Sequence, residues 1–232
     1  MAQREEKPLS LMIWERRATP HFESTPVPDA DLRQILEAGR QCPSGYNLQP
    51  WRVVVVREAE QRRRLREAAV SQPRVEEAPV IMVCCGDPEG YLRGDLEEVI
   101  RIGKEHGFTN EAQQERKRQA VHFLLDRPGP VGAVRPDRAV WINRQVMIAF
   151  STMMWMAEAL GYDTAPMEGF QEDKVREVLQ IPGRVRVVAM LAIGHRQGAD
   201  KPYGGRFPMS RVVFGEEWGK PLVFSEEEEK AA

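Results

Sequence analysis

Cysteine and histidine are scarce in this sequence, and neither is arranged as a disulfide framework or a metal site. The 232 residues contain three cysteines, and Cys42, Cys84 and Cys85 lack the C-x-x-C spacing of a metal or redox motif. The four histidines lie far apart and form no H-E-x-x-H pattern. The sequence therefore predicts neither a disulfide-stabilised fold nor a bound metal.

Long apolar runs are also absent. The longest, residues 146–160, contains Ser151, Thr152 and Glu158 and falls short of the roughly 20 apolar residues that span a bilayer. The opening residues, MAQREEKPLS, include no apolar segment of the kind a secretory signal needs. We therefore expect a cytoplasmic protein with no membrane partner.

Neither sign of charge dominates the chain. A formal net charge of −2 creates no overall field that would attract nucleic acid or anionic lipid. No G-x-G-x-x-G follows a strand pattern, and neither G-x-x-x-x-G-K-[ST] nor a nucleophile elbow occurs. The sequence thus supports no nucleic-acid partner, no Rossmann dinucleotide site and no P-loop.

What the sequence does contain is a succession of strand and helix patterns typical of one α+β domain. Apolar, β-branched runs predict buried strands at residues 51–56, 79–85 and 185–193. Helical patterns occur at residues 10–17, 29–40, 58–70, 111–118, 141–160 and 172–179. We predict a central mixed β-sheet flanked by helices, in a single domain over residues 10–224.

Three further stretches carry no such pattern. Residues 88–137 are polar and interrupted by glycine and proline, which predicts an excursion or lid. From residue 197 the chain is rich in glycine and proline and long enough to wrap around a neighbouring subunit. Residues 225–232 carry a run of glutamates typical of a charged tail.

Binding residues concentrate at junctions between elements, and paired arginines occupy the first such junction. Arg16 and Arg17 suit a phosphate, because guanidinium groups form bidentate, charge-assisted hydrogen bonds with it. Arg206, in a glycine-rich segment, could complete the same anion site. A solvated surface pair is the commoner explanation of two adjacent arginines taken alone.

The loop over residues 43–50 presents three neutral polar side chains. Ser44, Asn47 and Gln49 can both donate and accept hydrogen bonds, as the carbonyl and imide edge of an isoalloxazine ring requires. A turn in which these side chains cap their own backbone explains the loop equally well.

Residues 166–169 follow the apolar helix and contain a second candidate for contact with a flat ligand. Gly169 would let the backbone approach closely and offer its N–H, and Met167 would pack against an aromatic face. An ordinary proline-glycine turn with a surface glutamate is an equal alternative.

Taken together, these stretches resemble the FMN-dependent nitroreductase family. The motifs RR-x-T-x-x-F, P-S-G-x-N-x-Q-P-W and P-M-E-G-F occur in the family's order and approximate spacing, followed by a late arginine. The resemblance spans about Trp14 to Trp218. The second and third motifs together are a specific signature, whereas the paired arginines are not.

The resemblance implies a role for each matching residue. Arg16, Arg17 and Arg206 would hold the FMN phosphate, with Thr19 and the Ala18 backbone beside it. Ser44, Gly45 and Asn47 would come from the other subunit, and residues 166–169 would line the flavin with the Gly169 N–H near N5. Arg74 would contact the phosphate or the ribityl chain, with Gln72 beside it. The implied cofactor-binding residues are Arg16, Arg17, Ala18, Thr19, Pro43, Ser44, Gly45, Asn47, Gln49, Gln72, Arg74, Pro166, Met167, Glu168, Gly169 and Arg206.

The chain departs from the family pattern at three positions. Ala18 stands where many members have a phosphate-binding serine, Pro20 where some have a basic residue, and Gly204 where some have lysine. Affinity for the phosphate would then depend more on the arginines. Residues 88–137 match nothing diagnostic, so the electron acceptor is not identified.

The resemblance also implies an activity and an assembly. A homodimer would form around the helix at 141–160, with a domain-swapped C-terminal extension. FMN would take hydride from NADH or NADPH and reduce a nitroaromatic or a quinone by a ping-pong mechanism; no catalytic acid or base is assigned, because the cofactor carries the chemistry. Two alternatives are another small-molecule acceptor (an enone, a halogenated phenol or a flavin) and a flavin-binding protein without turnover.

Overall fold

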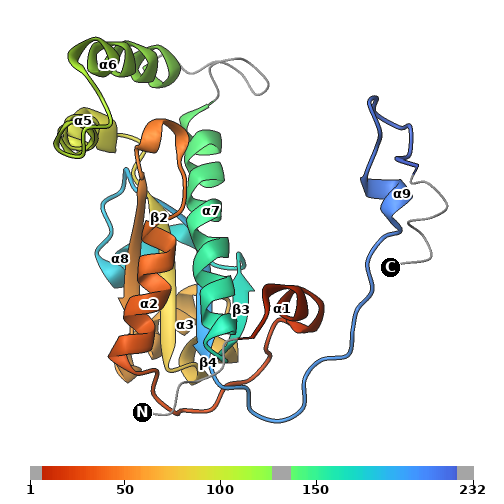
Figure 1. Ribbon diagram of the computed structural model, residues 1–232. Coiled ribbons are helices and arrows are strands. Elements are labelled where there is room, and N and C mark those ends of the chain that lie inside the picture. Colours follow the sequence, from red (N-terminus) through yellow and green to blue (C-terminus); the bar gives the residue numbers. More distant parts are fainter. Residues whose placement is uncertain (1–6, 127–136, 224–232) are drawn as a thin grey trace. The chain divides into compact units, whose positions relative to one another are not determined.

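The computed structural model describes residues 7–126 and 137–223. The chain forms two compact units, Met1–Lys201 and Pro202–Ala232. The first contains the sheet and nearly all the helices (Figure 1). The second contains the short helix α9 (Met209–Val212). The single domain over residues 10–224 stays a prediction, and the tail at 225–232 lies outside the described residues.

A four-stranded sheet in the order β1-β2-β4-β3 lies at the centre of the first unit. The strands are β1 (Trp51–Val56), β2 (Val80–Gly86), β3 (Asp163–Met167) and β4 (Arg186–Gly194). The α+β class is confirmed. All three pairings among the described residues are antiparallel, whereas we predicted a mixture of directions. Strand direction depends on where the intervening helices return the chain, which apolar patterns do not encode.

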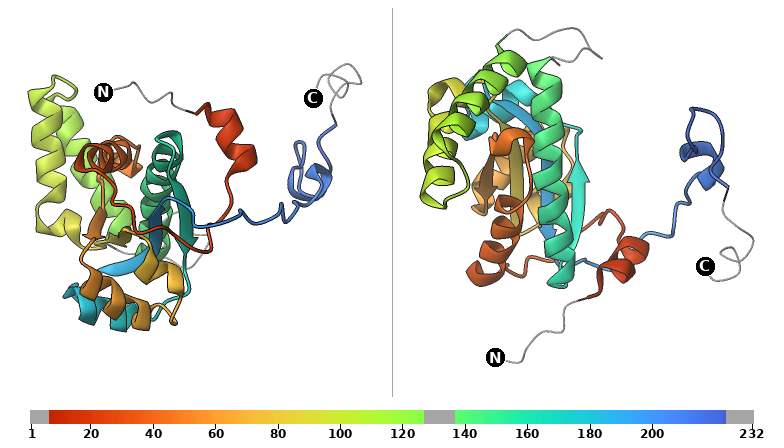
Figure 2. Two further views of the ribbon diagram at one scale, coloured as in Figure 1. Left: turned by 90° about the horizontal axis from the view of Figure 1, so that it is seen from below. Right: turned by 45° about the horizontal axis from the view of Figure 1, so that its top comes forward.

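Helices cover both faces of this sheet (Figures 1 and 2). Successive side chains of β2 alternate between two apolar cores, because a strand has a period of two residues. Val80, Met82 and Cys84 face a core shared with α2 (Asp29–Arg40) and α7 (Arg138–Ala159). The opposite core is shared with α3 (Ala59–Ala68), α4 (Pro73–Glu77) and α8 (Glu172–Leu179).

Two glycines bring α7 close to its neighbours. A Cβ atom on Gly39 of α2 would lie 2.6 Å from Met153 Cγ, and one on Gly86 of β2 would lie 2.2 Å from Ile142 Cγ2. Both distances are far below a normal contact, so glycine permits this packing.

The predicted helices and strands are present, and the structure adds elements that the patterns did not reveal. Helix α1 (Leu9–Glu15) lies where residues 10–17 predicted it. Strand β3 was missed because it is short and contains Pro166, a residue that strands accept mainly at sheet edges. Within residues 7–126 and 137–223, no helix has the length and continuous apolarity needed to cross a bilayer.

The polar region at 88–137 contains the 3-10 helix η2 (Gly90–Arg93) and two α-helices, α5 (Asp95–Glu105) and α6 (Glu111–Leu125). Helices α5 and α6 lie at one end of the sheet (Figures 1 and 2). Asn110 and Gln113 form a reciprocal capping box at the start of α6. The excursion is therefore helical in its described part. A role as a lid stays a prediction, and residues 127–136 lie outside the description.

Candidate functional site

The predicted phosphate-binding segment lies beside strand β3. Helix α1 ends at Glu15, and the backbone of Arg16 turns away from helical geometry, with φ −55° and ψ 129°. The backbone N–H of Thr19 donates to the carbonyl of Thr164 at 3.1 Å, and Thr19 is buried. This hydrogen bond attaches the segment from Arg16 to Thr19 to the sheet.

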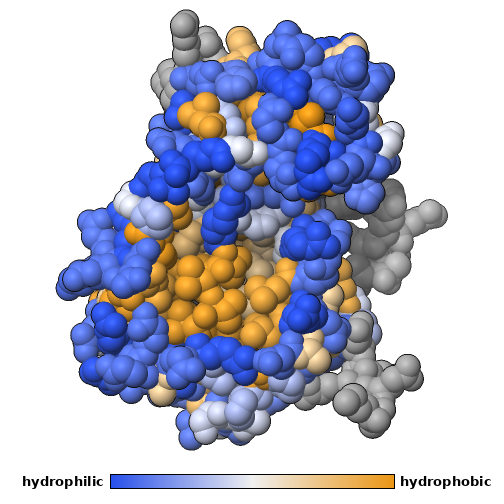
Figure 3. Space-filling model, turned by 90° about the vertical axis from the view of Figure 1, so that its left-hand side faces the viewer, coloured by the Kyte–Doolittle hydropathy of each residue, from blue (hydrophilic) through white to orange (hydrophobic). Residues whose placement is uncertain are grey.

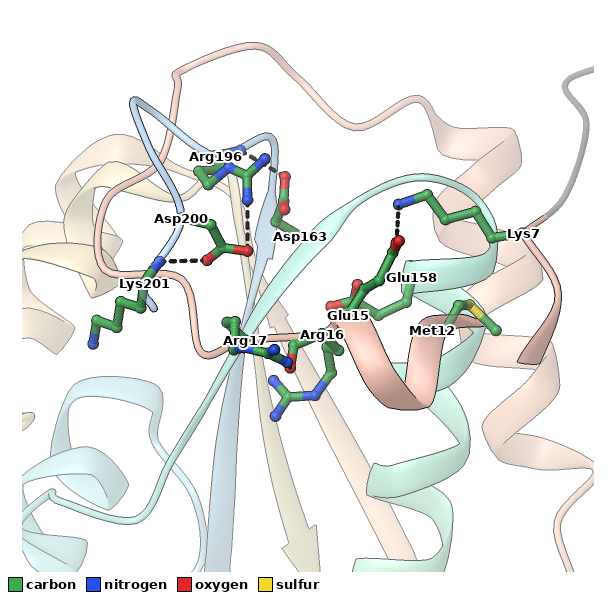
Figure 4. Close-up of a pocket in the computed structure, with 10 residues that line it drawn as sticks. All are labelled: Lys7, Met12, Glu15, Arg16, Arg17, Glu158, Asp163, Arg196, Asp200 and Lys201. Atoms are coloured by element: carbon green, nitrogen blue, oxygen red, sulfur yellow. Dashed lines mark hydrogen bonds and ion pairs between the residues drawn. The ribbon is translucent and has the colours of Figure 1, made fainter. Parts of the chain in front are cut away.

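Arg16 and Arg17 line a polar pocket of about 360 Å³ (Figure 4). Some of its charges are already paired. Arg196 contacts Asp200 at 2.6 Å and donates its backbone N–H to Asp163 at 2.8 Å. Lys7 lies 3.9 Å from Glu15. The pocket is lined by Lys7, Met12, Glu15, Arg16, Arg17, Glu158, Asp163, Arg196, Asp200 and Lys201.

Arg16 has unused hydrogen-bonding capacity in this pocket. Its Nη1 atom is buried and has no hydrogen-bond partner among the described residues. Arg17 differs, because its Nη1 donates to the Trp14 carbonyl at 2.7 Å. A buried donor without an acceptor is costly, so an anionic oxygen that reached Arg16 would bring a net gain.

Glu158 of α7 lines the same pocket and was not among the predicted site residues. Glu158 is 8% exposed, and its carboxyl group accepts a hydrogen bond from Thr164 Oγ1 at 2.6 Å. Burial raises the pKa of Glu158 to about 7, although the bond from Thr164 and the charge of Arg16 act in the opposite direction. The available sequence signal was a lone acid in an otherwise apolar helix.

A second pair of predicted stretches meets through Gln72. Its Nε2 donates to the Gly169 carbonyl at 2.8 Å and to the Ala69 carbonyl at 3.2 Å. Gln72 is the N-cap residue of α4, and Arg74 follows in that helix. The Nε atom of Arg74 is buried and, like Arg16 Nη1, has no partner among the described residues.

Residues 166–169 divide between the core and the surface. Met167 is 4% exposed and packs into the apolar core on the α8 side of the sheet. Pro166, Glu168 and Gly169 are exposed. The exposed backbone of this turn is therefore the part available to a ligand, whereas the Met167 side chain is occupied by core packing.

Loop 43–50 makes the internal hydrogen bonds of a self-capped turn. Ser44 Oγ accepts from the Gln49 backbone at 3.0 Å, and Gln49 Nε2 lies 3.3 Å from Asn47 Oδ1. Its backbone is nonetheless unusual, with positive φ at Tyr46 (54°), Asn47 (57°) and Gln49 (46°). Such conformations cost on the order of 1–3 kcal/mol each and cluster at functional sites.

The remaining predicted residues lie elsewhere. Gly45 N–H donates to Gln145 Oε1 of α7 at 2.7 Å, which attaches loop 43–50 to that helix. Arg206 belongs to the second unit, where its guanidinium lies 5.6 Å from the Tyr203 ring centroid. The structure thus brings together Thr19 with β3, and Gln72 with Gly169. A shared site for Arg16 and Arg206 stays a prediction.

Comparison with known proteins points to the same family as the sequence motifs. Residues 13–195 match the sequence model of the Nitroreductase family. A Thermus thermophilus protein named NADH dehydrogenase is 38% identical over 199 residues, which cover 86% of this chain and 91% of that protein.

Solved structures share the fold. A nitroreductase-like protein from Streptococcus mutans has a TM-score of 0.75 at 25% identity, covering 87% of this chain and 95% of that one. A complex with FMN from Exiguobacterium sibiricum has a TM-score of 0.78, covering 92% and 99%. Its identity of 23% makes it evidence for the fold alone.

Proposed function

The chain belongs to the nitroreductase family, and from this premise we propose that it binds FMN and transfers electrons from NADH or NADPH to a small organic acceptor. The observation that carries the proposal is the lack of a hydrogen-bond partner at two arginines in the positions implied for cofactor binding. Arg16 and Arg74 each hold a buried guanidinium nitrogen with no partner among the described residues. Phosphate or ribityl oxygens would supply the missing acceptors.

The residues present fit such a ligand. Arg16 and Arg17, with Arg206, would hold the phosphate, and the bond from Thr19 to β3 would keep the segment in place. Gln72 Nε2 donates a hydrogen bond to the Gly169 carbonyl and so orients this turn. The Gly169 N–H donates to no acceptor in the described part of the chain. That N–H would face the flavin. Bound FMN supplies the two-electron chemistry, so the protein needs to bind, orient and exclude water.

The proposed reaction balances without a metal or a further reactant. NADH or NADPH supplies a hydride, which is two electrons and a proton, and solvent supplies a second proton. A quinone leaves as its hydroquinone, or a nitro group loses one oxygen as water and becomes a nitroso group. The nicotinamide leaves before the acceptor enters, so both use one cavity in turn.

We expect the freshly purified protein to be yellow and to contain about one FMN per chain. Anaerobic mixing with NADH or NADPH in a stopped-flow instrument should bleach the flavin band within seconds, because hydride transfer reduces the ring. A colourless protein that takes up no added FMN would contradict the proposal. A flavin that stays oxidised for minutes would favour a binding protein without turnover.

The acceptor class has a separate test with the pre-reduced enzyme. We expect rapid reoxidation by nitroaromatics or quinones, followed by absorbance at the flavin band. Reoxidation by none of them, together with a response to an enone, a halogenated phenol or free flavin, would assign the same scaffold to that other acceptor.

Two surfaces support the proposed homodimer. Strand β1 is a sheet edge, and Val53, Val54 and Val55 on it are only half-buried. Figure 3 shows a broad apolar area on this side of the molecule. An exposed apolar edge offers unpaired N–H and C=O groups to another chain. The second unit is correspondingly rich in exposed apolar side chains, which would suit a swapped extension.

Trp218 provides a test of this assembly, since it is 92% exposed within its own chain and tryptophan is enriched among interface hot spots. We expect Trp218→Glu to raise the dimer dissociation constant at least tenfold in sedimentation experiments. Leu92→Glu, which changes an exposed residue of the first unit, is the control. A monomeric wild-type protein, or an unchanged dissociation constant in the Trp218 variant, would contradict the proposed dimer.

A further inference from the structure

A second pocket, of about 380 Å³, lies between loop 43–50 and the helical excursion. Helix α5 contributes one wall, α6 another, and the strained loop contributes Asn47. The pocket shares no lining residue with the polar pocket around Arg16. It is therefore a separate candidate for binding a small molecule.

The pocket is mostly apolar. Val99 and Ile102 lie three residues apart on α5 and so face the same side of that helix. The Phe108 backbone N–H donates to the Gly103 carbonyl at 2.8 Å, which holds the turn after α5, yet Phe108 is 77% exposed. An exposed aromatic residue on this hydrogen-bonded turn, beside aliphatic side chains, suits a flat, unsaturated ligand.

Lys117 of α6 gives this apolar pocket a positive charge. Burial lowers the pKa of Lys117, and the residue forms no ion pair among the residues that the structure describes. Two arginines of the same helices are paired: Arg101 contacts Glu98, and Arg118 contacts Glu97. Lys117 is thus a half-buried ammonium group without a carboxylate, which an anionic ligand would supply.

We propose that this pocket receives the electron acceptor and favours an aromatic carboxylate, with Lys117 pairing with the carboxylate and Phe108 and Ile102 packing on the ring. The inference rests on the proposed function, because loop 43–50 is the segment that the resemblance places at the flavin. Lys117 determines specificity through binding and takes no part in electron transfer. His106, which also lines the pocket, adds a second group able to donate to the carboxylate.

The kinetic test compares 4-nitrobenzoate with the uncharged 4-nitrobenzamide as acceptors for the FMN-loaded protein. In Lys117→Met we expect KM for the nitrobenzoate to rise about tenfold or more, as loss of a charge-assisted contact predicts, with kcat nearly unchanged. The constants for the nitrobenzamide should change less than twofold. Lys104→Met, at an exposed lysine of α5 outside the pocket, should match the wild type.

A binding test separates failure of this inference from failure of the proposed function. Benzoate titrated into the oxidised FMN-loaded protein in a calorimeter should bind about tenfold more weakly to Lys117→Met and normally to Lys117→Arg. If the wild-type protein turned over no acceptor but its binding of benzoate still depended on Lys117, the proposed activity would be refuted and the carboxylate site supported. Turnover with equal effects of Lys117→Met on both nitro compounds would overturn the inference and leave the activity intact.

Discussion

Replacing Arg16 by alanine is expected to raise the dissociation constant for FMN about 10- to 100-fold, and Arg16→Ala combined with Arg206→Ala should yield protein that purifies without flavin. Hydrogen bonds to charged groups contribute roughly 1.5–3 kcal/mol, and each 1.4 kcal/mol corresponds to a factor of ten. Arg16 Nη1 forms no hydrogen bond with any described residue, so removing this atom breaks no described hydrogen bond within the protein. Quenching of FMN fluorescence by apoprotein measures the constant directly.

Three comparisons make this result specific. Arg206→Ala alone should also release FMN, because it removes one charge-assisted contact of the same kind. Arg16→Lys should give an intermediate affinity, since lysine keeps the charge but loses the bidentate geometry. Arg33→Ala, at an exposed arginine of α2 away from the pocket, should bind FMN normally. Unchanged affinity in both the Arg16 and the Arg206 variants would refute the assigned phosphate site without affecting family membership.

Replacing Glu158 by glutamine is expected to remove a pH-dependent loss of stability. The pKa of Glu158 is raised from 4.5 to about 7 by burial, so the folded state retains a proton that the unfolded state has released. The free energy of unfolding therefore falls as pH rises from about 4.5 to 7 and stays low above pH 7. A rise in pKa from 4.5 to about 7 corresponds to a loss of about 3 kcal/mol in the free energy of unfolding.

Glutamine keeps an oxygen that can accept from Thr164 Oγ1 but carries no charge to bury. At pH 8 the variant should be more stable than the wild type by up to about 3 kcal/mol, and near pH 4.5 the two should be similar. Urea unfolding at several pH values and one protein concentration gives the difference. Glu177→Gln, at an exposed glutamate of α8, serves as the control. A difference that did not vary between pH 4.5 and 8 would rule out this role for Glu158.

Local patterns were sufficient for the fold class and for most of the elements. The apolar runs near 80–86 and 186–194 became strands because they could be buried on a sheet. The β-branched run at 51–56 also became a strand, but it lies at the sheet edge and is only half-buried, so the prediction that it is buried was wrong. The apolar helix at 141–160 became α7, which packs against α2 through Gly39. Motif order was likewise sufficient for membership in the family, since those motifs are read along the chain and need no coordinates.

Packing between distant segments lay beyond such patterns. Strand β3 contains a proline, which local propensity disfavours, and it exists because β4 pairs with it. The bond from Gln72 to Gly169 joins residues 97 positions apart, so no local signal could reveal it.

The sequence by itself determined an α+β domain of the nitroreductase family, because periodicity and motif spacing are properties of neighbouring residues. Tertiary structure alone decided the electrostatics. The buried nitrogen of Arg16, the raised pKa of Glu158 and the uncompensated charge of Lys117 each depend on what surrounds the group. The cost of a charge is set by its solvent exposure and its partners, and both arise only when the chain has folded.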